Sequence, residues 1–348
     1  MNLPDPRAWL SFKCYSLKTD MQTSTPADSE HLTSARAGSN EAFTALVEPH
    51  RKPLLVHCYR MSGSLDDAED LVQETFLRAW NKLKSFDGSG SFRNWLYVIS
   101  TRLWLDEARK RNKRILLPLD GDAADPDSPP QPPISPASWL DPLPESWLSS
   151  IDPSPEFSYE RRETISFAFM VALQKLNARQ RVVLILREVF NWSAEEVANV
   201  LELTVDSVNN LLYRARKNLE PSPFEETSAP KQYLNQFVNA WESGDVPSLI
   251  QLLHQKATFA MPPMGVWYAG RDSIQRALRN FAFVPDSKWK LIPASANGHP
   301  AFGIYRGEME NYHAFSLLLP IFADDKIVEV TAFLSPQLVA RFGLPESI

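Results

Sequence analysis

The chain has little cysteine and no long apolar run, and both absences limit what it can be. Its 348 residues include two isolated cysteines, Cys14 and Cys58, without metal-ligand neighbours. This excludes a disulfide framework and favours reduced, unpaired thiols. No apolar stretch approaches the roughly 20 residues that span a membrane, and the N-terminus lacks a secretion-signal pattern. We therefore expect a cytoplasmic protein without a metal site, with a disordered lead over residues 1–30 in which Met21 is an alternative start to Met1.

Basic residues are missing from one long segment, which explains the acidic balance of the chain. Residues 118–156 contain eight acidic residues, eleven of the 28 prolines and no Lys or Arg, so the rest carries a net charge of +2 against −6 overall. This composition predicts an extended, mobile linker over residues 117–156. Trp139, Leu140 and Trp147 are costly to expose, so we expect this piece to dock on another surface.

A helix–turn–helix pattern runs from Ser193 to Lys217. Ser193 and Glu196 form a capping box that starts a first short helix, and Thr204 can cap a second. Apolar residues at helical spacing give each helix one buried face. The outward face of the second helix carries side chains that suit base edges and phosphates: Ser207, Asn209, Asn210, Tyr213, Arg214 and Lys217. By itself, the pattern fits a helical hairpin in an ordinary bundle equally well.

Two longer helices are predicted between Ser64 and Arg114. The first has an apolar face and carries acidic residues in its N-terminal half, where they complement the helix dipole. The second adds the aromatics Trp95, Tyr97 and Trp104 to the chain's densest basic run: Arg93, Arg102, Arg109, Lys110, Arg111, Lys113 and Arg114. Aromatics among cations suit unpaired bases, since stacking contributes on the order of 1–3 kcal/mol per base. An ordinary core also explains most of these aromatics.

With residues 41–61, this block resembles region 2 of bacterial sigma factors, and residues 173–219 resemble region 4. The short connection between them is similar to that of the extracytoplasmic-function (ECF) group. The resemblance implies that the linker runs through the active-site and RNA-exit channels of the polymerase, where an acidic strand would mimic nucleic acid. A plain solvated tether explains the acidic first half of the linker equally well. The resemblance implies two all-α domains, region 2 over residues 31–116 and region 4 over residues 157–222. It also implies a protein that binds core RNA polymerase and initiates transcription at the minus-ten and minus-thirty-five elements of promoter DNA, without a cofactor or catalytic residues.

Individual roles follow from the same resemblance. Asp70, Gln73 and Glu74 are expected to contact the clamp coiled coil of the polymerase, although a well-capped surface helix also explains acidic residues there. The expected minus-thirty-five contacts are the six outward residues of the helix–turn–helix, and the expected minus-ten contacts are Arg93, Asn94, Trp95, Arg102 and Arg109. Where relatives usually carry a Lys and an Arg, this chain has Asn209 and Leu211, which predicts weaker duplex affinity and a shallower salt dependence.

The C-terminal part, residues 231–346, has an α+β pattern. A helix ending at Gly244 is followed by a short strand and a second helix reaching Phe281. The expected strands are 258–261, 289–296, 313–322 and 326–334. The segment MPPMGVWYAGRDSI and residues 330–334 resemble the SnoaL-like branch of the NTF2-like fold. The predicted fold class is therefore multi-domain: two all-α sigma domains, a region 2 bundle and a region 4 helix–turn–helix, plus a C-terminal α+β NTF2-like cone.

Such cones often enclose a pocket, which leaves two alternative functions open. An enzyme could use His254, Asp272, His299 or His313 for proton transfer, although none of them sits in a recognisable catalytic pair. A ligand-responsive regulator could bind duplex DNA by itself. Region 2 has no purpose under either alternative. We therefore expect a sigma factor, not an enzyme, whose C-terminal domain modulates its activity and can hold a small-molecule ligand.

Overall fold

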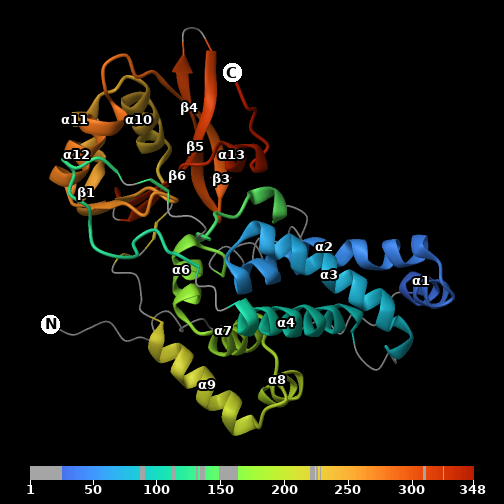
Figure 1. Ribbon diagram of the computed structural model, residues 1–348. Coiled ribbons are helices and arrows are strands. Elements are labelled where there is room, and N and C mark those ends of the chain that lie inside the picture. The colour runs from blue at the N-terminus through green and yellow to red at the C-terminus, as the bar shows by residue number, and fades with distance from the viewer. Residues whose placement is uncertain are drawn as a thin grey trace. The chain divides into compact units, whose positions relative to one another are not determined.

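The computed structural model describes residues 26–86, 91–111, 115–130, 132–133, 138–148, 164–219, 224, 226–227, 229–308, 311–323 and 325–348 (Figure 1). The chain divides into two compact units. Unit 1 comprises Met1–Arg114, Trp147–Thr164 and Ala168–Pro221, and unit 2 comprises Ile115–Ser146, Ile165–Phe167 and Ser222–Ile348. Residues 1–25 of the expected lead, and Lys113 and Arg114 of the basic run, lie outside the described residues.

The first half of unit 1 is a helical bundle of α1 (Pro26–Arg36), α2 (Asn40–Ser62), α3 (Leu65–Lys82) and α4 (Phe92–Arg111). Helix α1 begins at Pro26, so the prediction of a disordered lead is wrong for residues 26–30. Gly63 ends α2 with a left-handed φ of 72°, and its amide donates to the Tyr59 carbonyl at 2.7 Å. Ser64 then caps α3 by accepting from the Asp67 amide. This tight αL turn folds α3 back onto α2.

The second half of unit 1 contains α6 (Phe167–Lys175), α7 (Ala178–Leu184), α8 (Ala194–Leu201) and α9 (Val205–Asn218). The capping box of Ser193 and Glu196 is formed, and Thr204 caps α9 through the Ser207 amide, which confirms both predicted helix starts. Glu202 ends α8 with a φ of 55°, which makes the turn between the two helices. The buried stripe of α9 consists of Val208, Leu212 and Ala215, as the periodicity predicts.

Unit 2 is built on a sheet whose six described strands follow the order β2-β1-β6-β5-β4-β3. The strands are β1 (Leu253–Ala260), β2 (Trp267–Ala269), β3 (Trp289–Ala296), β4 (His299–Glu308), β5 (Asn311–Ala323) and β6 (Lys326–Phe333). Only the β1–β6 pair is parallel among the described pairings. The predicted strand 289–296 matches β3, whereas β2 and β4 were not expected.

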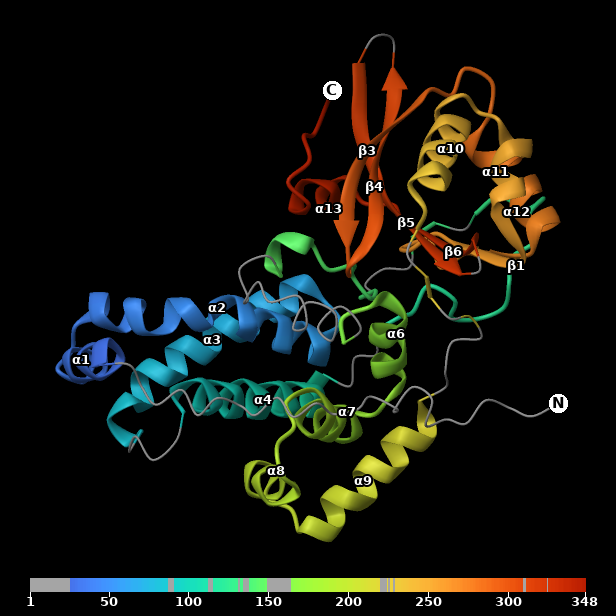
Figure 2. The ribbon, with the colours of Figure 1, turned by 180° about the vertical axis from the view of Figure 1, so that it is seen from behind.

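Helices α10 (Lys231–Glu242), α11 (Val246–Leu252) and α12 (Arg271–Ala277) gather beside β1 in both views (Figure 2). Helix α13 (Pro336–Arg341) packs against β5. The apolar core fills the space between the first three helices and the sheet, with Trp241 and Phe259 stacked at 6.4 Å between ring centroids. The single helix predicted to end at Gly244 is thus followed by a second one, α11, which Asp245 caps.

Linker residues 115–146 belong to unit 2, which corrects the prediction of a mobile tether for this part of the chain. Leu140 and Leu143 have no exposed surface. The Leu143 amide donates to Oδ1 of Asn297 at 2.7 Å, and the Asn297 amide donates to the Leu143 carbonyl at 2.9 Å. The expectation that the apolar piece docks is confirmed at Leu140 and Leu143, and backbone hydrogen bonds fix the position of Leu143.

Candidate nucleic-acid interface

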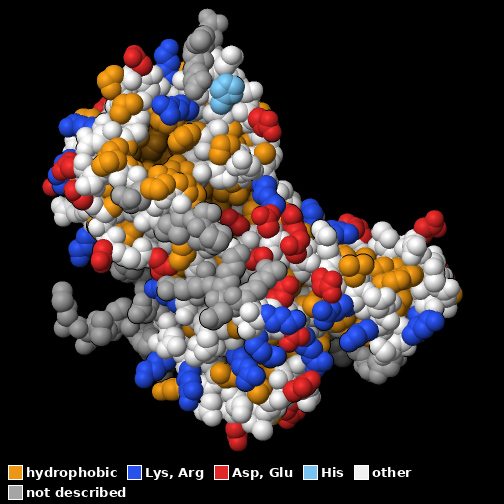
Figure 3. Space-filling view, viewed as in Figure 1, with side chains coloured by type: hydrophobic (Ala, Val, Ile, Leu, Met, Phe, Trp, Pro, Cys, Tyr) orange, Lys and Arg blue, Asp and Glu red, His pale blue; other side chains and the backbone are white. Residues whose placement is uncertain are grey.

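Helix α9 presents a polar face made of the predicted minus-thirty-five residues. Asn209, Asn210, Arg214 and Lys217 are exposed, and Tyr213 is 67% exposed. Ser207 is half-buried, and its Oγ lies 2.8 Å from Oγ1 of Thr204 at the helix start. The spacing of these residues places them on the side opposite the buried stripe. Figure 3 shows Lys and Arg side chains gathered over α7 and α9.

Arg216 differs from its neighbours, because its guanidinium pairs with the Glu188 carboxylate. The pair ties α9 to the turn that ends α7, so Arg216 acts within the fold while Arg214 stays exposed. Asn209, Tyr213 and Lys217 lie at i, i+4 and i+8, and Asn210 and Arg214 form a second i, i+4 pair beside them. A helix with this face can follow a major groove, with its amides and guanidinium reaching bases or phosphates.

The predicted polymerase contacts form a stripe on α3. Asp70, Gln73 and Glu74 are all exposed, and Glu74 pairs with Arg78 at 2.8 Å. Leu77 continues the stripe one turn further and is 60% exposed, which is unusual for a leucine on a well-packed helix. Sequence reasoning missed Leu77; its place seven residues after Asp70 was the signal that could have found it.

The predicted minus-ten residues do not share one face of α4. Trp95, Arg102 and Arg109 are spaced by seven, so they align along the helix, whereas Arg93 lies about 160° away around the axis. Arg93 sits over the Tyr97 ring at 5.4 Å. Trp95 and Asn94 are half-buried, with Trp95 packed on Phe86.

Nε of Arg93 also donates to the Tyr97 hydroxyl at 3.4 Å, and the other two cations have acidic partners. Nε of Arg102 donates to the Val200 carbonyl at 3.1 Å, and its guanidinium lies 3.5 Å from the Glu202 carboxylate, both at the end of α8. Arg109 is 3.4 Å from Asp106 on its own helix. Of the extra aromatics, Tyr97 and Trp104 are buried, so the core explanation holds for them.

Buried polar groups join the two halves of unit 1, and sequence reasoning did not identify them. The Arg181 guanidinium is 8% exposed and donates to the carbonyls of Met61, Gln174 and Leu176 and to the Gln174 side chain. It also lies over the Trp104 ring at 5.3 Å. Long charged residues on short amphipathic helices usually face water, so nothing in the local pattern marks Arg181 as buried.

His57 lies in the same junction. Its Nε2 is 3.0 Å from Oγ1 of Thr101, and its ring packs edge-on against Tyr97 and Phe190. Burial, together with the charge of Arg60, lowers the pKa of His57 to about 3, so the imidazole is neutral. The junction is therefore held by hydrogen bonds and packing around a neutral ring rather than by an ion pair.

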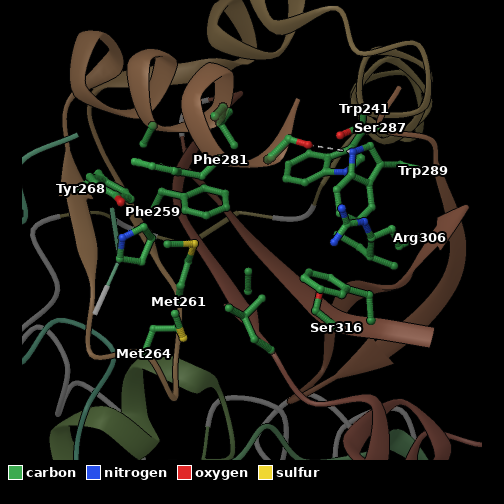
Figure 4. A pocket seen from close by; sticks show the side chains of 18 residues that line it. Trp241, Phe259, Met261, Met264, Tyr268, Phe281, Ser287, Trp289, Arg306 and Ser316 are labelled. Atoms are coloured by element: carbon green, nitrogen blue, oxygen red, sulfur yellow. Dashed lines mark hydrogen bonds between the residues drawn. The ribbon is translucent and has the colours of Figure 1, made fainter. Parts of the chain in front are cut away.

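Unit 2 contains a cavity of ≈ 180 Å³ between the sheet and the helices (Figure 4). Its large apolar lining residues include aromatic and thioether side chains: Trp241, Phe259, Met261, Met264, Phe281, Trp289 and Phe315. Tyr268, Ser287, Arg306 and Ser316 supply its polar groups. On the face in Figure 3, hydrophobic side chains surround a hollow in the part that holds α10, α12 and β1.

The four candidates for proton transfer lie outside the lining of this cavity. His299 pairs with Glu226 at 3.0 Å, and His254 accepts from the Lys256 amide through Nδ1. Asp272 and His313 are exposed. The described lining residues include no Asp, Glu, His or Lys, so the cavity offers no side chain whose ordinary pKa suits a general base near neutral pH.

A half-buried acid, Glu329, lies elsewhere in unit 2. Desolvation raises its pKa to about 7; the hydrogen bond from Thr331 opposes this shift, and the nearby charge of Glu226 adds a smaller upward contribution. Glu329 alternates along β6 with Val330, a residue of the apolar core between helices and sheet, so the acid points to the other face. It therefore serves no reaction in the cavity.

Comparison with known proteins assigns a class to each part of the chain. Residues 46–114 match the family "Sigma-70 region 2", residues 166–219 match "Sigma-70, region 4", and residues 234–331 match "SnoaL-like domain". A protein with both sigma regions is a sigma-70-type initiation factor, a class of non-enzymatic transcription factors. None of the described helices combines the length and hydropathy needed to span a bilayer.

The chain belongs to the family of ECF RNA polymerase sigma factors. It is 39% identical over 319 residues to ECF RNA polymerase sigma factor SigG of Mycobacterium tuberculosis, covering 88% of this chain and 85% of SigG. SigJ of the same organism is 30% identical over 217 residues, which cover 61% of this chain and 62% of SigJ. The crystal structure of SigJ shares the fold, with a TM-score of 0.56 at 22% identity over 87% of this chain and 99% of that one. As a member of this family, the chain binds core RNA polymerase and promoter DNA and initiates transcription.

Proposed function

We propose that the exposed face of α9 reads the minus-thirty-five element and that the α3 stripe docks on the polymerase. The observation that carries the first part is the exposure of Asn209, Asn210, Tyr213, Arg214 and Lys217 on one side of a capped helix. For the second part, the support is the exposed Leu77 beside Asp70, because an apolar side chain within an acidic stripe is typical of a docking surface. The proposed minus-ten contacts are Arg93, Asn94, Trp95, Arg102 and Arg109, with Arg102 leaving Val200 and Glu202 when DNA binds.

Two substitutions with matched controls test these contacts. Arg214→Ala is expected to weaken binding of the holoenzyme to a minus-thirty-five duplex by roughly tenfold, as loss of one base or phosphate contact does. Arg216→Ala, on the same helix but paired with Glu188, should change it less than threefold if α9 reads DNA in this orientation. Asp70→Lys should prevent co-elution with core polymerase, and Glu48→Lys, an exposed acid paired with Arg51 on α2, should not. Equal effects within either pair would reject that contact.

The C-terminal domain acts, in this proposal, as a regulatory module rather than an enzyme, and the setting is the cytoplasm. Support comes from the linker residues 115–146, which belong to unit 2, and from a cavity lined by described residues without a base. Linker residues bonded to unit 2 cannot at the same time follow the path through the polymerase that the sigma family implies for them. Unit 2 therefore inhibits binding to core RNA polymerase until the linker is released from it.

Asn297→Gly tests this regulatory role at a single residue. Asn297 has a φ of 53°, which glycine adopts without strain, and its side chain bonds both the Leu143 amide and the Ile165 carbonyl. Loss of both bonds should free the linker and increase co-elution with core polymerase. Asp286→Gly, at another positive φ of 67°, is the control. A version ending at Ser222 should behave like Asn297→Gly, and unchanged polymerase binding and transcription in both would reject regulation by unit 2.

A further inference from the structure

The linker completes the cavity of unit 2. Residues 121–130, here called the strap, lie along the sheet edge formed by β2: the Ala124 amide donates to the Trp267 carbonyl at 2.8 Å, and Nε1 of Trp267 donates to the Gly121 carbonyl at 3.3 Å. At the far end of the strap, Pro130 lines the cavity. A sigma-factor linker therefore supplies part of the wall of a pocket that the C-terminal domain would otherwise form alone.

The strap is held by side chains of α12 and the turn that follows it. Asn280 donates to the Pro126 carbonyl at 3.0 Å and to Asp127 at 3.3 Å, and Arg276 pairs with Asp127. Asp125 makes the turn by accepting from the Asp127 amide at 3.1 Å and from the Ser128 hydroxyl at 2.9 Å. These bonds lower the pKa of Asp125, which keeps the turn formed and charged at neutral pH.

Two buried hydrogen-bond donors of the cavity lack partners among the described residues. The Tyr268 hydroxyl belongs to a residue that is 1% exposed, and Nε1 of Trp241 to one that is 5% exposed. Both residues line the cavity, where Trp289 instead satisfies its own Nε1 through the Ala282 carbonyl at 3.1 Å (Figure 4). Buried polar groups are normally bonded, so two unpaired donors on residues that line one cavity favour a ligand that carries hydrogen-bond acceptors.

Size and charge narrow the class of ligand. The cavity of ≈ 180 Å³ is somewhat larger than an apolar cavity of about 150 Å³ that holds benzene, so it suits one or two fused rings. Its aromatic lining favours a flat apolar body. Arg306 is exposed and lies directly across from Trp289 in the β3–β4 pairing, which puts a cation at the rim. All these polar groups can donate, and a rim cation favours an anionic acceptor.

We propose that unit 2 binds a small aromatic carboxylate, with its rings in the cavity, its oxygens toward the buried donors and Arg306, and the strap as one wall of the site. Because the strap is part of the site, ligand binding and strap docking stabilise each other by the same factor. A bound ligand holds the linker on unit 2. The regulatory consequence rests on the proposed function, whereas binding itself is measured on the purified full-length chain without polymerase.

Three probes with the same ring system and different polar groups test the class of ligand by calorimetry: 2-naphthoate, methyl 2-naphthyl ketone and 2-naphthylmethylamine. We expect one site per chain, with 2-naphthoate tightest, the ketone weaker and the cationic amine weakest. Arg306→Gln should weaken 2-naphthoate by roughly tenfold, as loss of a charged hydrogen bond does, and leave the ketone within threefold. If none of the three probes binds saturably, the proposal is wrong, and the sigma function is unaffected.

A pair of Tyr→Phe variants locates the site. Tyr268→Phe removes a hydroxyl without a bonded partner, so it should weaken 2-naphthoate about tenfold while the protein melts at the same or a higher temperature. Tyr305→Phe removes a hydroxyl that donates to the Pro345 carbonyl at 2.7 Å outside the cavity. It should lower the melting temperature and leave affinity unchanged. Binding that survives Tyr268→Phe unchanged would place the ligand elsewhere and overturn the site.

Hydrogen exchange tests the role of the strap. The Ala124 amide should exchange more slowly with saturating 2-naphthoate than without it, and the Tyr268→Phe variant should show less slowing at the same probe concentration. The Tyr312 amide, which donates to the Ile348 carbonyl at 3.0 Å outside the cavity lining, is the internal control. Binding without any slowing at Ala124 would show that the strap is not part of the site and would overturn the linkage.

Discussion

Arg181 in unit 1 and Tyr268 in unit 2 are both buried, but only Arg181 has hydrogen-bond partners among the described residues. Four oxygens accept from the Arg181 guanidinium, and none accepts from the Tyr268 hydroxyl. Satisfied buried groups fix one packing arrangement, and an unsatisfied one keeps a free-energy cost that a ligand can remove. Nε of Arg181 also lacks a partner in the described part of the chain, so the comparison is between two groups and not between two whole interiors. The fold itself binds most of the Arg181 guanidinium, whereas the Tyr268 hydroxyl is left for a ligand.

The strongest test of this comparison is to remove each polar group. Arg181→Met leaves several buried carbonyls without a donor, so the free energy of unfolding of unit 1 should fall by about 3 kcal/mol. Tyr268→Phe should leave unit 2 unchanged or stabilise it by up to about 1 kcal/mol. Urea unfolding followed by circular dichroism measures both. Arg179→Met, an exposed arginine on the same helix α7, should stay within about 0.5 kcal/mol. A similar loss of unfolding free energy in Arg181→Met and Tyr268→Phe would show that the two buried groups do not differ in this way.

The two units should also respond to pH in opposite directions. The pKa of Glu329 is raised from 4.5 to about 7, so its contribution to stability is present below pH 4.5 and is lost as pH rises through 7. The pKa of His57 is lowered from 6.5 to about 3, so its contribution is present above pH 6.5 and is lost as pH falls toward 3. We expect on the order of 2 kcal/mol for Glu329, because its residue is partly exposed.

Glu329→Gln isolates the second unit in that experiment. The amide cannot ionise, so thermal unfolding of unit 2 should lose its dependence on pH between 4.5 and 7 while that of unit 1 keeps it. The charge of Glu226 acts on Glu329, and Nε2 of His299 lies 3.0 Å from the Glu226 carboxylate, so the variant is compared with Glu226→Gln as a control. If the stability of unit 2 depends on pH in Glu329→Gln as it does in the unmodified protein, the pH dependence belongs to Glu226 and His299 instead.

A smaller effect sharpens the comparison on the surface of unit 1. Restoring a cation with Asn209→Lys on the exposed face of α9 should add about one phosphate contact. The slope of log affinity against log salt for a holoenzyme on duplex DNA should then steepen by about 0.9. Affinity at low salt should rise several-fold. Glu48→Lys, on α2 and outside both proposed DNA contacts, is the control for added charge alone. No change in slope would show that residue 209 does not approach the duplex.

Local patterns predicted the parts of this chain that depend on neighbouring residues. The capping box at Ser193, the cap at Thr204 and strand β3 follow from sequence spacing, and all three are present. Strand β4 was missed because its alternation is broken by Pro300, Gly303 and Gly307.

Long-range partners account for the remaining misses. The burial of Arg181 depends in part on the Met61 carbonyl of α2, which lies 120 residues earlier in the chain. Docking of the linker likewise depends on Trp267, Asn280 and Asn297, which lie far along the chain. The proline and acidic content of the linker does not reveal these partners, and the prediction of a mobile tether was therefore wrong. The candidate bases were chosen by residue type, and the cavity lining, which excludes all four, appears only when the sheet and helices are assembled.

The smallest expected effect tests whether the strap is a surface segment that can leave unit 2 or a part of its core. Asp127 and Arg276 form an ion pair with both side chains more than half exposed, at 54% and 56%, and such pairs contribute at most about 1 kcal/mol. Asp127→Asn should therefore change the free energy of unfolding of unit 2 by no more than about 0.5 kcal/mol.

The same variant should still speed exchange of the Ala124 amide and weaken the affinity for 2-naphthoate up to threefold, because a loosened strap must be ordered again on binding. Asp122→Asn, an exposed strap residue with no ion pair in the described part of the chain, should change neither. If Asp127→Asn unfolds unit 2 instead, the strap is a structural part of its core, and a linker that cannot leave cannot regulate.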